Sequence, residues 1–86
     1  MKQILKIQDF ITICNNVTLY YHGNSYKETL NYTFRDNLNR LKSLIYEKSN
    51  NKQAIIYCIN EILYTAAVLE IQELNALPKK YYKIEF

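Results

Sequence analysis

The residues in this chain best suited to chemistry are two cysteines and one histidine: Cys14, His22 and Cys58. A structural zinc site would need all three to converge and a fourth ligand besides, and no CxxC or HxxxH spacing supports one. A Cys–His nucleophile built from Cys58 and His22 is formally open. However, Cys58 falls on the apolar side of its expected helix, where burial raises the pKa of a thiol and makes it unreactive. We therefore expect a core thiol, a surface imidazole and no metal site.

Phosphate binding and acid–base catalysis also lack their usual residues. The chain has a single glycine, so it cannot build a Gly-rich phosphate loop. Glu70 and Glu73 lie with Gln72 at an expected helix end and look solvated, whereas acid–base work at neutral pH needs a carboxyl group in an apolar pocket. We expect a protein that is not an enzyme and uses no cofactor.

Composition indicates one small packed domain, residues 1–86. The chain is 49% hydrophobic with one Gly and one Pro, which argues against disorder. Its net charge of +3 is too weak for a strong nucleic-acid footprint. Nine tyrosines and many Asn, Ile and Lys residues share AT-rich codons, which favours a low-GC source such as a bacterium or phage.

The expected location is the cytoplasm, or the host cytoplasm for a viral protein. The charged start, Met1 to Phe10, does not resemble a signal peptide, and two cysteines without a secretory segment are typical of buried thiols in a reducing compartment. The longest apolar stretch, residues 54–69, is interrupted by Asn60 and Glu61, so we expect it not to span a membrane.

A β-hairpin is predicted over residues 17–34. The turn His22-Gly23-Asn24-Ser25 suits a two-residue type II′ connection, with Gly23 at the position that needs positive φ. Alternation then places apolar residues on one face, with only Glu28 out of place.

Helices are predicted on both sides of this hairpin. Residues 4–15 form a short helix whose first turn could instead be a strand. Residues 36–48 form a helix capped by Asp36, and residues 52–76 form a long central helix ended by Pro78. The tail, residues 81–86, is a candidate strand beside the hairpin. The predicted fold class is therefore α+β: a short N-terminal helix, a β-hairpin, two helices and a C-terminal strand, with a small antiparallel sheet packed on the helices.

Two buried stripes follow from the helical spacing. The second helix contributes Leu38, Leu41, Leu44 and Ile45. The long helix contributes Ile55, Cys58, Ile59, Ile62, Ala66 and Leu69.

The long helix carries a second apolar stripe opposite this core face. Tyr57, Tyr64, Val68 and Ile71 fall within about 60° of one another on a helical wheel. Either another segment of the chain covers this stripe, or it is a dimer seam or a docking surface for another protein. Tyrosine suits docking because it adds contact area at low entropic cost.

A basic and aromatic face is the second candidate. Its residues would have to converge from the second helix, the hairpin and the tail, and they would suit RNA or single-stranded nucleic acid. An ordinary solvated face is the simpler interpretation. The residues are Arg35, Asn39, Lys42, Tyr46, Lys79, Lys80, Tyr20 and Lys27.

The leading hypothesis is a protein-binding module that regulates or inhibits a larger host protein or protein complex. A phage or mobile-element accessory protein, such as an anti-CRISPR-type inhibitor of a host defence nuclease, is of this size and composition. A small nucleic-acid-binding protein and a self-associating structural subunit, such as a homodimer, are the alternatives. No membrane partner is expected.

Overall fold

A computed structural model describes residues 2–17 and 25–86, and there the chain starts with a strand. β1 (Gln3–Lys6) leads directly into α1 (Ile7–Asn15), whose buried residues Ile7, Phe10 and Cys14 follow helical spacing. The prediction of a helix over residues 4–15 is therefore wrong for residues 4–6, where the alternative of a strand holds.

The predicted hairpin is replaced by a helix wherever the structure describes it. α2 spans Ser25–Tyr46, so residues 25–34 are helical, and the helix predicted to start at Asp36 is the second half of this longer one. Residues 18–24, which include Tyr20, His22 and Gly23, lie outside the described residues.

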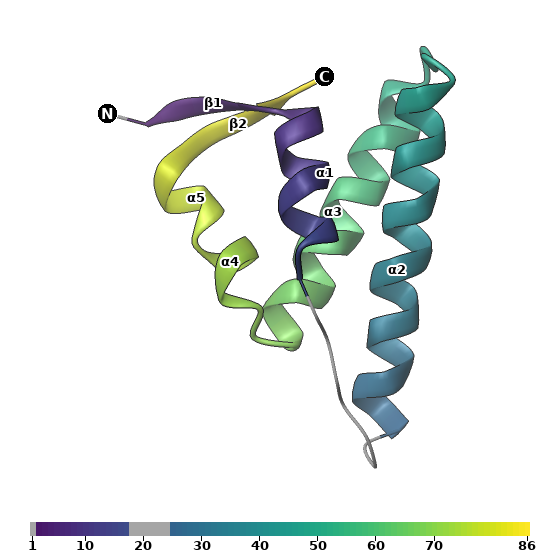
Figure 1. The fold of residues 1–86 in the computed structure, drawn as a ribbon, viewed down its shortest axis with the longest axis vertical. Helices are drawn as coiled ribbons and strands as arrows, with labels where there is room; N and C mark the ends of the chain where they lie inside the picture. The colour runs from purple at the N-terminus through teal and green to yellow at the C-terminus, as the bar shows by residue number, and fades with distance from the viewer. Residues whose placement is uncertain (1, 18–24) are drawn as a thin grey trace.

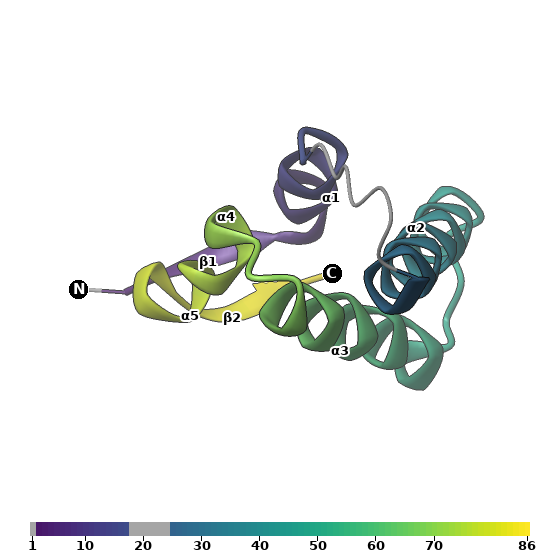
Figure 2. The ribbon, with the colours of Figure 1, turned by 90° about the horizontal axis from the view of Figure 1, so that it is seen from below.

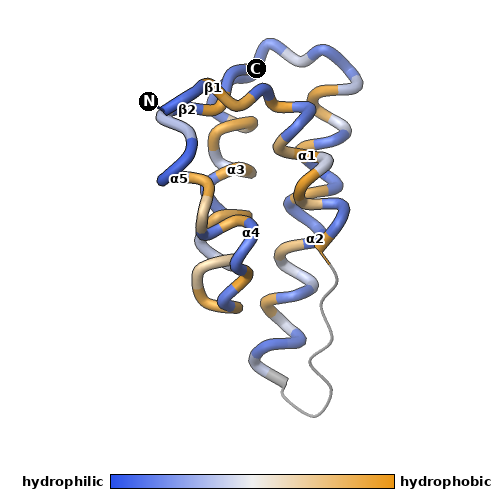
Figure 3. Tube along the Cα trace, turned by 60° about the vertical axis from the view of Figure 1, so that its left-hand side comes forward, coloured by the Kyte–Doolittle hydropathy of each residue, from blue (hydrophilic) through white to orange (hydrophobic). Residues whose placement is uncertain are grey.

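A helical apolar stripe explains why α2 extends so far toward the N-terminus. Leu30, Phe34, Leu38 and Leu41 recur at intervals of three or four; the first is half-buried and the others are buried. Hydrophilic and hydrophobic residues alternate along α2 in Figure 3. Glu28, which the predicted hairpin placed on its apolar face, is exposed on α2.

α3 (Lys52–Val68) runs antiparallel to α2 and packs along it (Figure 1). Its first turn is capped by Asn51, whose Oδ1 accepts a hydrogen bond from the backbone N–H of Ala54 at 3.0 Å. The predicted core face of this helix is confirmed, because all six of its residues are buried.

The long helix ends earlier than predicted, and Pro78 does not end it. Glu70 has a φ of 59° and turns the chain. The N–H groups of Glu70 and Ile71 donate to the carbonyls of Ala67 and Ala66, at 3.3 and 2.9 Å, which is a Schellman motif. Two short helices follow, α4 (Gln72–Asn75) and α5 (Leu77–Lys80), and Pro78 lies in the first turn of α5.

The sheet is parallel and pairs the two ends of the chain. β2 (Tyr81–Glu85) lies beside β1, with Leu5 opposite Ile84 and one irregularity between Gln3 and Ile4. The predicted small antiparallel sheet is therefore wrong: in the described residues the sheet has two strands, and the tail pairs with the start of the chain. Figure 2 shows the strand pair on the opposite side of α3 from α2.

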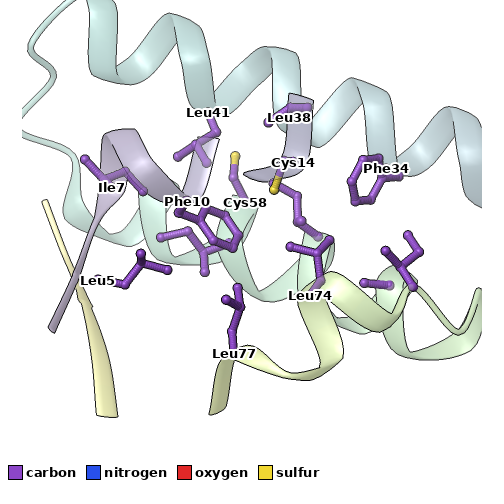
Figure 4. Packing of buried hydrophobic residues seen from close by; sticks show 14 of the residues in the cluster. Leu5, Ile7, Phe10, Cys14, Phe34, Leu38, Leu41, Cys58, Leu74 and Leu77 are labelled. Atoms are coloured by element: carbon purple, nitrogen blue, oxygen red, sulfur yellow. The ribbon is translucent and has the colours of Figure 1, made fainter. Parts of the chain in front are cut away.

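One core joins all of these elements (Figure 4). Its buried residues come from β1, every helix and both cysteine positions. They are Leu5, Ile7, Phe10, Cys14, Phe34, Leu38, Leu41, Ile55, Cys58, Ile59, Ile62, Ala66, Leu69, Ile71, Leu74 and Leu77.

No single helix in the described ranges has both the length and the apolar character needed to cross a membrane. α3 and residues 72–80 meet these requirements only as a pair, with a bend of 118° between them.

Candidate functional site

The four residues of the predicted second stripe on α3 separate into two groups. Tyr57 and Tyr64 are 54% and 63% exposed, whereas Val68 is half-buried and Ile71 is only 4% exposed. The turn at Glu70 takes Ile71 off the helix and into the core. Of this set, only the two tyrosines are mostly exposed.

The exposed side of α3 carries almost no charge. After Lys52, its exposed residues fall within about 100° of the helix circumference. None of them is Asp, Glu, Lys, Arg or His, and the nearby Glu61 is half-buried. We call this set the α3 outer face. It consists of Gln53, Ile56, Tyr57, Asn60, Tyr64 and Ala67.

A hollow of about 310 Å³ continues the α3 outer face toward the sheet. Its α3 wall includes Ile56 and Asn60, and its other wall includes Tyr82 of β2 and Phe86, which follows β2. Ile56, Tyr82 and Phe86 are 45%, 61% and 44% exposed. We call this hollow the β2 groove. Together with the α3 outer face it forms one continuous, mainly aromatic and aliphatic surface, because Ile56 and Asn60 belong to both.

The predicted basic face is not brought together. Arg35, Asn39 and Lys42 line a hollow of about 260 Å³ between α1 and α2. Lys79 and Lys80 line a different hollow beside Lys2, and α5 lies across the molecule from α2 in Figures 1 and 2.

The remaining residues of the predicted basic face do not restore it. Tyr46, at the end of α2, is 88% exposed, and Lys27 is half-buried. Tyr20 lies outside the described residues. The positive charge is therefore divided between two sides of the molecule.

The two thiols are core groups. Cys14 and Cys58 are both free and buried. Burial raises the pKa of Cys14 to about 12, although nearby Lys42 lowers it in part. Burial also raises the pKa of Cys58, against a lowering effect of Arg40. Both thiols are therefore protonated near neutral pH, and a protonated thiol is a poor nucleophile.

No group of three or more His, Cys, Asp or Glu side chains that could hold a metal ion occurs in the described part of the chain. His22 lies outside the described residues, so its surface position stays a prediction.

Sequence reasoning missed several contributors to this surface, among them Ile56, Asn60, Tyr82 and Phe86. Two signals were present. The arc from Gln53 to Ala67 has no charge, and the tail alternates so that Tyr82, Ile84 and Phe86 share one side. The sequence did not indicate that the tail lies beside α3. Comparison with protein-family models, curated proteins and solved structures finds no match to this chain.

Proposed function

We propose that this domain is a non-enzymatic protein-binding module that holds a larger protein through the α3 outer face and so regulates or inhibits it. The observation that carries the proposal is the exposure of Tyr57 and Tyr64 on a helix face that has no exposed charged residue after Lys52.

The chemistry of this face suits a protein partner. Charged residues are depleted at the centre of protein interfaces, because burying an unpaired charge is costly, whereas Tyr is enriched there. Tyr57 and Tyr64 lie two turns apart on the same side of α3, with Asn60 between them. That spacing offers two aromatic anchors and an amide that can hydrogen-bond to the partner.

A protein partner is favoured over a nucleic acid by the distribution of charge. Nucleic-acid affinity depends on several cations that contact phosphates together. The α3 outer face has no cation after Lys52, and the predicted basic residues lie on two separate sides of the molecule.

A paired capture experiment tests the proposal. The tagged wild type is compared in lysate from its source cells with a Tyr57→Ser/Tyr64→Ser variant. The matched control is Tyr26→Ser/Tyr32→Ser on α2, whose tyrosines are 64% and 67% exposed. Circular dichroism melting confirms that all three proteins are folded.

The proposal expects one protein retained in stoichiometric amounts by the wild type and by the α2 control, and lost at least tenfold by the α3 variant. It is wrong if no stoichiometric partner is retained, or if both variants retain the partner as well as the wild type does.

A further inference from the structure

The outer edge of β2 has no backbone partner among the described residues. The sheet there has two strands, so β2 is paired on one side by β1 and has its second edge unpaired. The β2 groove lies between this strand and α3. An unpaired edge of this kind is a template for another strand.

The sequence of β2 is complementary to itself when a second copy runs antiparallel. With Ile84 opposite Ile84 of the partner, Lys83 lies opposite the partner's Glu85, and Tyr82 lies opposite the partner's Phe86. By symmetry each pair occurs twice. Opposite charges and aromatic pairs directly across an antiparallel ladder are both stabilising.

In this register the core-facing and solvent-facing sides of the two strands also coincide. Ile84 lies opposite the buried Leu5 in the sheet, so its side of β2 faces the core. Phe86 shares that side by alternation, and Lys83 and Glu85 are exposed on the other. Tyr82 is 61% exposed and lies at the irregularity of the sheet. Pairing centred on Ile84 keeps apolar against apolar and charge against charge.

The neighbouring registers that preserve the faces are unfavourable. Centring on Lys83 places two lysines opposite each other, and centring on Glu85 places two glutamates opposite each other. β1 has no such self-complementarity, because Gln3–Lys6 contains one cation and no acid.

We propose that two copies of this chain associate through antiparallel pairing of their β2 edges, about a twofold axis at Ile84. The pairing turns two short parallel sheets into one four-stranded sheet, and a two-stranded sheet is the arrangement least able to stand alone. This association uses a surface other than Tyr57 and Tyr64, so it goes beyond the proposed function and can fail without it.

Charge reversal tests both the association and its register. Sedimentation equilibrium follows the wild type, Lys83→Glu, Glu85→Lys and the double reversal from low micromolar to millimolar concentration. Lys79→Glu is the control, because it makes the same charge change as Lys83→Glu at an exposed residue of α5. Melting curves confirm that each variant is folded.

The wild type and the control are expected to approach twice the monomer mass of 10.3 kDa as concentration rises. Each single reversal opposes like charges at two symmetric positions and should weaken the dimer about tenfold or more. The double reversal should restore it. An equimolar mixture of the two single variants should form a mixed dimer, because the strand with two acidic side chains then faces the strand with two basic ones.

A wild type that stays monomeric throughout overturns the proposal. So does a dimer that neither single reversal weakens, since its interface would lie elsewhere. Loss of association in the double reversal and in the mixture would overturn the register.

Discussion

α2 and α3 both present exposed tyrosines, but in different surroundings. Tyr26 and Tyr32 of α2 are 64% and 67% exposed on a surface that also exposes Glu28, Arg35 and Asp36. Tyr57 and Tyr64 of α3 are exposed to a similar degree, on a face with no exposed charged residue after Lys52. Exposure of an aromatic ring alone therefore does not identify a contact surface.

α2 and α3 differ in the charge on their outer sides, but both bury an apolar inner side. A partner that covers the outer side of α2 must remove water from several ionised groups, and one that covers α3 need not. Their inner sides form one shared core, with Leu41 of α2 and Ile62 of α3 fully buried. Three experiments can break or sharpen this comparison.

The largest effect is expected from truncating the shared core. Leu41→Ala and Ile62→Ala should each lower the free energy of unfolding by about 2–5 kcal/mol, because each removes apolar contacts and leaves a cavity. Urea denaturation measures the loss, and Ile62→Val should cost only about 0.5–1.5 kcal/mol. A loss below about 1 kcal/mol for either alanine variant would mean that the two inner faces are not equivalent.

The next effect is a loss of stability at high pH. The pKa of Cys14 rises on folding from 9.0 to about 12, so the folded state holds this proton more tightly than the unfolded state. The resulting stabilisation is fully present below pH 9.0 and is lost as pH rises toward about 12. The contribution falls by about 1.4 kcal/mol per pH unit within that window.

Urea denaturation of the wild type and Cys14→Ala near pH 8 and near pH 10 isolates this contribution. The wild type should lose about 1 kcal/mol more than the variant between the two conditions. Equal losses would show that Cys14 does not carry this pH dependence. Cys58 adds a loss of the same sign in both proteins, since burial raises its pKa too.

The smallest effect concerns the ends of the two helices. Lys48 and Glu70 have φ values of 55° and 59°, a conformation in which a side chain is unfavourable and glycine is not. Lys48→Gly and Glu70→Gly should each raise the free energy of unfolding by about 0.5–1 kcal/mol. Ala67→Gly, inside α3, is the control and should cost about 1 kcal/mol. Destabilisation of both turn variants by a similar amount would contradict the turn geometry.

Sequence patterns predicted the core side of α3 because apolar residues recur there at helical spacing without interruption. The same kind of pattern gave a wrong prediction for residues 25–34, which are helical. Tyr, Thr and Phe are strand-forming types, and their alternation beside Gly23 resembled a hairpin. The competing helical repeat, Leu30–Phe34–Leu38–Leu41, extends across the predicted boundary at Asp36 and decides the outcome.

Two further features could not be read from local sequence. The end of α3 depends on a non-glycine residue, Glu70, in the left-handed region, so no glycine marks it. The pairing of β1 with β2 joins residues about eighty positions apart, and nothing local specifies it. For the candidate site, Tyr57 and Tyr64 were singled out, but whether another segment covers them was left open. Ile71 was placed on the same stripe because the helix was predicted to continue past Val68, whereas the structure buries Ile71.

Site-specific photocrosslinking tests the central claim most directly. A benzophenone amino acid is placed at Tyr64 in one protein and at Tyr32 in another, and each is irradiated in its source cells. We expect one discrete covalent adduct with a larger protein from position 64 and none from position 32. Absence of an adduct from position 64, or the same adduct from both positions, would contradict the assignment of the α3 outer face as the binding surface.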